Sequence, residues 1–204
     1  MCWSESSFRG ELRVSIDPVK AIRDADFMFE NMQVKIVANR NSPEIELPGI
    51  KIGPFTEGKE YEVRYWVAIE LKKAGIAHIR MEEPLDLMML NKIQWKERNQ
   101  TSQKVLSVPE NFYPKLRRFL EELNDEAIKK PEKRQDSEKA KNLSVDIVRM
   151  RLKKIVSLAS SGRDQTSIIR HGLTKEEEFL YERLHKIISG WKNQILNTQG
   201  ADSE

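Results

Sequence analysis

The sequence predicts an α+β protein that is mainly helical, with a small β-rich domain first and a bundle of about five helices after it. Before residue 64, short segments alternate apolar and charged residues, which is typical of half-buried strands. After residue 64, apolar residues recur three and four positions apart, which is typical of amphipathic helices. The segment 52–73 contains the change of period. We therefore expect a β-rich domain at 1–63 and a helical domain at 64–204.

The β-rich domain is predicted from three short segments and the turns between them. Residues 34–37 and 44–47 alternate apolar and charged side chains, and a Pro-Gly turn separates the latter from 50–52. Strands of this length joined by tight turns indicate a small antiparallel sheet. The stretch 18–29 fits a short helix as well as a strand, and both alternatives stay open.

The first three helices are predicted from their ends and their apolar spacing. The first begins near Arg64 and ends before Gly75, which suits the left-handed position that follows many helices. The second begins at Pro84 and the third at Pro109, because proline is favoured in a first helical turn. The predicted apolar faces are Val67, Leu71 and Ala74, then Leu85, Met88, Met89 and Ile93, then Phe112, Leu116, Phe119, Leu120 and Leu123.

The last two helices follow a charged stretch. Residues 124–141 contain almost no apolar side chains, so we expect an exposed linker or frayed helix ends there. The fourth helix ends before Gly162. The fifth begins at Thr174, where Thr174 and Glu177 form the T-x-x-E pattern of a capping box. The predicted apolar faces are Val148, Leu152, Ile155 and Ala159, then Leu180, Leu184, Ile187, Ile188, Trp191 and Ile195.

Composition indicates a cytoplasmic protein. The chain has 204 residues, of which 33% are charged, and its net charge is only +3. Cys2 is the single cysteine, which excludes a disulfide framework and a thiolate metal cluster. No apolar run approaches the roughly 20 residues of a membrane span, and the N-terminus lacks the pattern of a secretion signal. We expect no membrane association.

Positive charge is concentrated in one region. Residues 129–163 carry 11 basic and 4 acidic side chains, a balance of +7. Arg149, Arg151, Lys153 and Lys154 are its best candidates for phosphate contact. Their spacing distributes them around a helix, and no aromatic residues lie between them for base stacking. The region therefore predicts weak, salt-sensitive contact with DNA, and an ordinary solvated helix face is the alternative.

Catalytic chemistry is not indicated by the sequence. His78, His171 and His185 lack the local spacing of a metal site. The acidic residues 176–178 suit the first turn of a helix, and Cys2 lies in a terminus where a nucleophile is poorly positioned. There is no glycine-rich phosphate loop. We expect no catalytic residue, cofactor or metal, and no enzyme activity.

Three motifs resemble those of GINS complex subunits, in the class with a small B domain before a helical A domain. Residues 52–55, Ile-Gly-Pro-Phe, followed by 66–73, Trp-Val-Ala-Ile-Glu-Leu-Lys-Lys, resemble the passage G-P-F…W-L-A-x-x-L-K-K. Residues 108–113 are similar to the L-P-x-x-Y-x helix start, and 173–181 to the segment L-T-x-E-E…L-Y. Together they cover roughly 45–196.

The chain departs from the family pattern at two places. It has Arg64-Tyr65 where Pro-Leu is common, and residues 84–87, Pro-Leu-Asp-Leu, lack the tryptophan of the family's P-x-W-L helix start. These departures fit a divergent archaeal member, which would be nucleoid-associated.

The resemblance implies a non-catalytic subunit of a heterotetramer with a second GINS subunit class, two copies of each. Such complexes attach to the MCM helicase and to a RecJ-like partner, and they support unwinding at replication forks. Large apolar side chains dominate subunit interfaces. We therefore expect inter-subunit anchors at Phe112, Leu116, Leu184 and Trp191, with packing in the chain's own core as the open alternative. A nucleic-acid-binding protein that uses the basic region 129–163 is the competing function.

Overall fold

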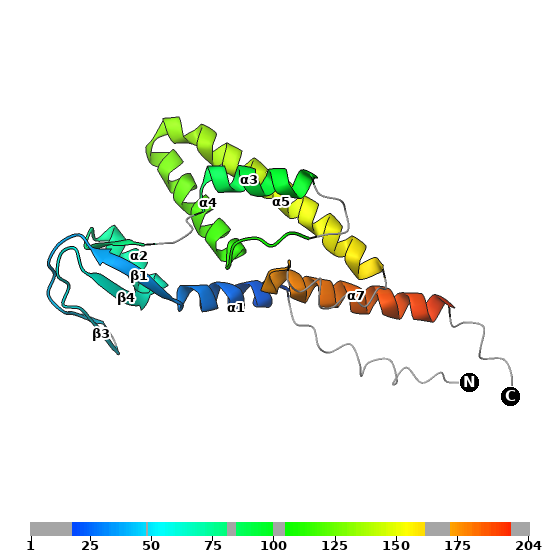
Figure 1. The fold of residues 1–204 in the computed structure, drawn as a ribbon, viewed down its shortest axis with the longest axis horizontal. Coiled ribbons are helices and arrows are strands. Elements are labelled where there is room, and N and C mark those ends of the chain that lie inside the picture. The colour runs from blue at the N-terminus through cyan, green and yellow to red at the C-terminus, as the bar shows by residue number, and fades with distance from the viewer. Residues whose placement is uncertain (1–17, 48, 81–84, 100–104, 162–171, 197–204) are drawn as a thin grey trace, which may run out of the picture.

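The computed structural model describes residues 18–47, 49–80, 85–99, 105–161 and 172–196. The fold is α+β and mainly helical, with small sheets first and a helical bundle after them (Figure 1), which confirms the predicted fold class. None of the helices in these ranges has the length and apolar character needed to cross a lipid bilayer.

Two small antiparallel sheets form the N-terminal unit. Strand β1 (Gln33–Ala38) lies between β4 (Glu60–Arg64) and β5 (Ala77–Ile79). Strands β2 (Ile45–Leu47) and β3 (Ile50–Ile52) pair as a hairpin. The strands expected at 34–37, 44–47 and 50–52 are thereby confirmed.

Helix α2 (Tyr65–Lys73) shares one apolar core with these strands. Val67, Ala68 and Leu71 are buried together with sheet residues such as Ile36 and Ala77. Gly75 has φ +68°, as expected for the left-handed position after a helix. A boundary after residue 63 would pass through this core, so the division into domains stays a prediction.

Helix α1 (Pro18–Glu30) resolves the alternative left open at 18–29. It runs from the sheets to the helical bundle, where it lies beside α7 (Figure 1). Arg117 forms an ion pair with Asp26 at 2.5 Å, and Arg118 forms one with Glu30. These contacts hold α1 against the bundle.

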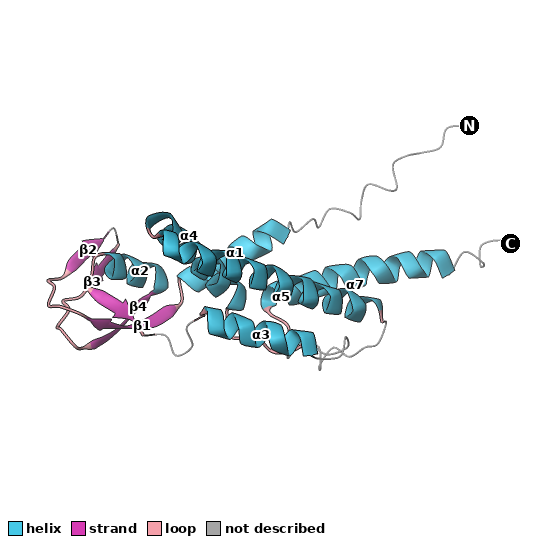
Figure 2. Cartoon of the chain, turned by 90° about the horizontal axis from the view of Figure 1, so that it is seen from above, coloured by secondary structure: helices cyan, strands magenta, loops and turns pink. Residues whose placement is uncertain are grey.

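Within the part of the chain that the structure describes, four helices build the bundle: α3 (Leu87–Asn99), α4 (Phe112–Lys129), α5 (Arg134–Ser160) and α7 (Lys175–Leu196). Helices α4 and α5 form an antiparallel hairpin, and α3 lies along α5 (Figures 1 and 2). Their shared core consists of Leu90, Ile93, Phe112, Leu116, Leu123, Ala140, Leu143 and Ile147.

Helix covers most of the stretch 124–141, where the sequence predicted an exposed linker. Helix α4 continues to Lys129, a 3-10 turn occupies Pro131–Lys133, and α5 begins directly afterwards. Ala127 and Ala140 are buried where the two helices meet, so a few small residues are enough to keep this stretch helical. The charged majority faces solvent, which is why composition alone suggested a linker.

Two helices begin later than predicted. Pro84 lies outside the described residues, and α3 starts at Leu87 because the Asp86 carboxylate accepts a hydrogen bond from the Met89 amide at 2.7 Å. Helix α4 starts at Phe112 rather than at Pro109, after Asn111 in the left-handed region with φ 55°.

Candidate subunit interface

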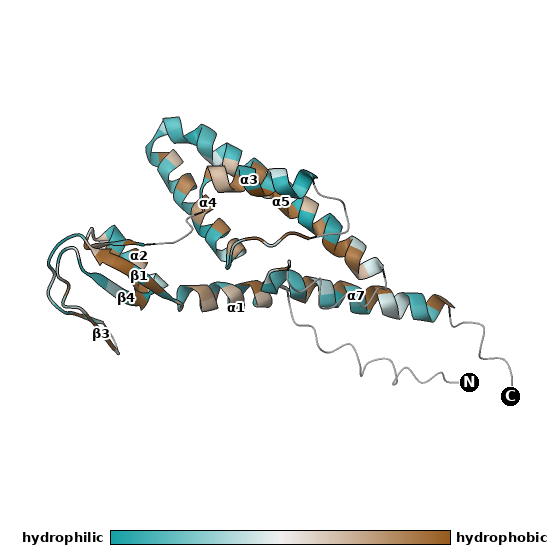
Figure 3. Ribbon diagram, viewed as in Figure 1, coloured by the Kyte–Doolittle hydropathy of each residue, from teal (hydrophilic) through white to brown (hydrophobic). Residues whose placement is uncertain are grey.

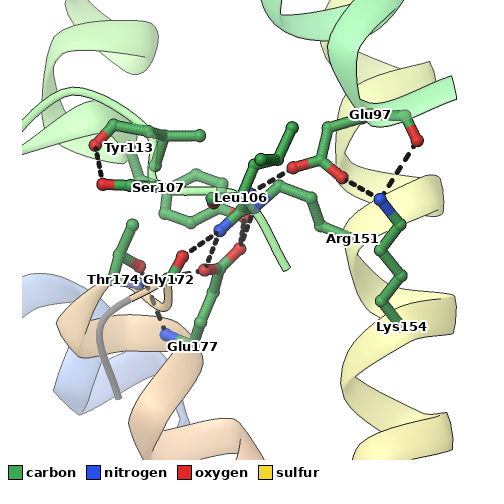
Figure 4. Close-up of polar contacts among 10 residues, drawn as sticks. Glu97, Leu106, Ser107, Tyr113, Arg151, Lys154, Gly172, Thr174 and Glu177 are labelled. Carbon is green, nitrogen blue, oxygen red and sulfur yellow. Dashed lines mark hydrogen bonds and ion pairs between the residues drawn. The ribbon is translucent and has the colours of Figure 1, made fainter. Parts of the chain in front are cut away.

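A buried ion network lies between the helices of the bundle (Figure 4). Arg151 on α5 is fully buried and donates two hydrogen bonds of 2.6 Å to the Glu177 carboxylate and one of 2.5 Å to Glu97. Its remaining donor capacity is directed at the carbonyl oxygens of Leu106, at 2.8 Å, and Gly172, at 2.9 Å. A single guanidinium therefore joins α3, α5, α7 and two connecting segments.

Lys154 and Tyr113 complete the network. The Lys154 ammonium donates to Glu97 at 2.5 Å, and the Tyr113 hydroxyl donates to Glu177 at 2.6 Å. Burial and the Glu177 charge raise the pKa of Tyr113, which keeps its hydroxyl a neutral donor. Burial alone lowers the pKa of Arg151, but its bonds to Glu177 and the charge of Glu97 raise it by more. The network thus balances two cations against two carboxylates.

The capping box predicted at the start of the last helix is confirmed. The Glu177 amide donates to the Thr174 hydroxyl at 3.3 Å, and the Thr174 amide donates to the Glu177 carboxylate at 3.0 Å. Glu177 therefore caps α7 and anchors Arg151 with the same carboxylate.

Replacing Thr174 with alanine should lower the free energy of unfolding by about 1 kcal/mol, because an N-cap hydroxyl is lost. Urea denaturation followed by circular dichroism measures this loss. Thr174→Ser keeps the hydroxyl and should match the parent chain. Equal stability of the alanine and serine variants would exclude a capping role for this side chain.

An apolar groove of about 560 Å³ opens between α1, α5 and α7. Tyr113 and Glu177 are among its lining residues, so the ion network, which links α5 to α7, borders the groove. Its apolar walls include Leu180, Leu184 and Ile187 from α7, Val148, Leu152 and Ile155 from α5, and Ile22 from α1, and the charged residues Arg117, Glu176 and Arg183 also line it.

Exposed apolar side chains extend this groove in both directions. Helix α7 projects beyond the end of α5 (Figures 1 and 2). Along the C-terminal half of α7, Ile187, Trp191 and Ile195 are between 56% and 66% exposed. Figure 3 shows apolar positions recurring along both helices. On α5, Val145 and Val156 continue the exposed stripe. A contiguous apolar surface of this kind marks a contact with another protein.

The four predicted interface anchors divide into two pairs. Phe112 is fully buried and Leu116 is 4% exposed, so both are core residues of the bundle. Leu184 lines the groove, and Trp191 is 65% exposed on the projecting end of α7. The sequence did not indicate the contribution of α5, because its apolar face was predicted without any interface role.

The predicted phosphate contacts also divide. Arg149 and Lys153 are exposed on α5. Arg151 and Lys154 are buried in the ion network, which contradicts a role for these two in nucleic-acid contact. Within the described ranges, no group of three or more histidine, cysteine or acidic side chains is placed to hold a metal ion.

Both parts of the fold match domains of known protein families. Residues 85–196 match the helical bundle domain of GINS complex proteins, and residues 21–80 match the PSF2 N-terminal domain. The DNA replication complex GINS protein PSF2 of Homo sapiens is 30% identical over 97 residues, which are 48% of this chain and 51% of that protein. PSF2 of Xenopus laevis is 29% identical over the same length and shares.

The chain spans about half the length of these curated relatives in the matched region. GINS subunits are non-catalytic scaffold proteins, in agreement with the expectation that the chain is not an enzyme. The matched bundle covers more than half of the sequence, and the chain therefore belongs to the GINS family, with a PSF2-like N-terminal domain before the GINS helical bundle.

Proposed function

We propose that this chain is a scaffold subunit of a GINS complex in DNA replication and that it binds a second class of GINS subunit through the groove between α5 and α7. The observation that carries this proposal is the apolar surface of the groove, which stays exposed although the bundle core is complete. Its relatives are named as DNA replication complex proteins, which supports the setting.

The wider assembly proposed here is a heterotetramer with two copies of each subunit class, of archaeal type. It would attach the MCM helicase and a RecJ-like partner at the replication fork. The contribution of this chain is positional, because binding energy from apolar helix faces holds partners in a productive geometry.

The groove is suited to an amphipathic helix of the partner subunit. Its walls are helices held at a fixed separation by the bidentate pair of Arg151 and Glu177, so little ordering remains to be done on binding. Arg149 and Lys153 lie beside the exposed stripe of α5 and favour acidic residues along the edge of that helix.

Replacing Leu152 with aspartate should prevent assembly, because it places a charge in an apolar contact and the carboxylate would lose its hydration when the partner covers the groove. We expect at least about a 30-fold loss of affinity, the size of an interface hot spot. Size-exclusion chromatography with light scattering, after mixing with a GINS subunit of the second class, measures this.

Ser157→Asp is the matched control, since Ser157 is exposed on the same helix and outside the groove. It should assemble like the parent chain. If Leu152→Asp assembled normally, the interface would lie outside the groove. A parent chain that remains monomeric with every second-class subunit would overturn the proposed function itself.

A further inference from the structure

The exposed face of α3 presents a tryptophan among basic side chains. Trp95 is 64% exposed, whereas tryptophan side chains are highly buried on average. Lys92 and Arg98 lie three positions before and three after it, so both neighbour the indole on the helix surface, and the exposed Lys96 lies one turn after Lys92. Net charge along the sequence does not indicate this pattern, because these cations lie outside the strongly basic region 129–163.

The charge of this face is not neutralised. Within the described residues, Lys92, Lys96 and Arg98 have no ion pair or hydrogen bond, whereas Arg117 and Arg118 on α4 are both paired. Glu97, the one acidic residue within α3, is turned inward to the ion network. The exposed side of the helix therefore carries cations and no carboxylate.

A recess of about 300 Å³ lies between α3 and the segment 106–109. Lys92 and Lys96 are among its lining residues, together with Glu97, whereas Trp95 and Arg98 are not. The Cα atoms of Lys92 and Lys96 are one helical turn apart, about 6 Å along the helix axis. Both side chains are exposed, so they can contact phosphates on the side of the helix next to Trp95.

We propose that this face of α3 binds single-stranded nucleic acid, with a base stacked on the Trp95 indole and phosphates held by Lys92, Lys96 and Arg98. Aromatic stacking combined with surrounding cations is how proteins hold single strands without reading their sequence. The apolar part of the face is limited to Trp95 and Met88. It offers far less apolar surface than a protein partner finds in the α5–α7 groove, which favours a polyanion with stackable rings.

This site is separate from the proposed subunit interface. Helices α3 and α7 each pack on α5, which lies between them (Figure 2). A partner seated in the groove would therefore leave the Trp95 face open. A scaffold role alone requires no affinity for nucleic acid, so the inference goes beyond the proposed function.

Fluorescence anisotropy of a labelled oligothymidylate of about 20 nucleotides, longer than usual single-strand site sizes, tests this with the full chain. Trp95→Ala should weaken binding by about 5- to 150-fold, the range for loss of one stacked base. Trp95→Phe should retain most of the affinity because a ring remains. Lys92→Gln with Lys96→Gln should reduce the slope of log affinity against log salt by about 1.4, the value for two lost phosphate contacts.

Arg134→Gln with Lys139→Gln removes two exposed cations from α5 and is the matched control. It should bind like the parent chain. Parent-like binding by Trp95→Ala, or a larger loss from the α5 pair than from the α3 pair, would overturn the proposal. If polyglutamate displaced the oligonucleotide equally from the parent and from Trp95→Ala, the face would belong to an acidic protein segment instead. Unchanged circular dichroism confirms that each variant folds.

Discussion

Replacing Arg151 with methionine is expected to lower the free energy of unfolding by about 3–5 kcal/mol, the cost of breaking a buried ion pair on one side. Methionine keeps apolar volume at the site but leaves two buried carboxylates facing one ammonium group. Glu177 would lose both bonds of 2.6 Å, and the carbonyl oxygens of Leu106 and Gly172 would lose their donor. Urea denaturation followed by circular dichroism measures the loss.

Arg149→Met is the matched control, on the same helix and two positions earlier. Its side chain is exposed, so the free energy of unfolding should change by no more than about 0.5 kcal/mol. Arg151→Lys should not restore stability, because an ammonium group cannot reproduce the fork that holds Glu177. Equal stability of the two methionine variants would show that the network contributes nothing to the fold.

The ion network is the part of the molecule that the sequence concealed most fully. Its members come from four helices, and only the packing of those helices brings them together. A sum of charges cannot distinguish a buried arginine from a solvated one, so Arg151 and Lys154 were assigned to a basic surface. One signal was present, since Ile147, Arg151 and Ile155 recur every four residues and all three are buried. An arginine within an apolar stripe indicates a buried cation that needs carboxylate partners.

Local sequence patterns predicted the secondary-structure elements that local interactions stabilise. Alternation predicted β1 to β3, and the T-x-x-E pattern predicted the start of α7 to within one residue. Strand β5 was not predicted, because its three residues are strand only through their pairing with β1. The Glu60–Arg64 strand had a usable signal, since Tyr61 and Val63 alternate with charged residues. These residues were instead interpreted as the segment that leads into the first predicted helix.

Periodicity identified apolar helix faces but could not tell which faces meet the chain's own core. Val148 and Leu152 continue the spacing of Ile155, yet they are 41% and 44% exposed and line the groove. Helix α5 is in fact surrounded by contacts on several sides, so its apolar residues serve two surfaces. The same ambiguity explains why two of the predicted interface anchors are core residues.

We therefore expect alanine substitutions at Phe112 and Trp191 to have opposite effects on stability and on partner binding. Phe112→Ala should lower the free energy of unfolding by about 3–5 kcal/mol, because it opens a cavity at a fully buried site. Trp191→Ala should change that free energy by no more than about 0.5 kcal/mol, since the indole is 65% exposed on the projecting end of α7. Urea denaturation of both variants measures this difference.

The two variants should also differ in their affinity for the second-class GINS subunit. Titration with that partner measures this affinity, under conditions in which both variants are folded. Trp191→Ala should weaken binding by about tenfold or more, because large aromatic side chains in desolvated interfaces carry much of the binding energy. Phe112→Ala should bind with parent-like affinity once folded, since its side chain never reaches the surface. If Trp191→Ala bound like the parent chain, the partner would end within the groove and leave the projecting end of α7 uncovered. If Phe112→Ala were as stable as the parent chain, the bundle core around α4 would be packed differently from the structure described.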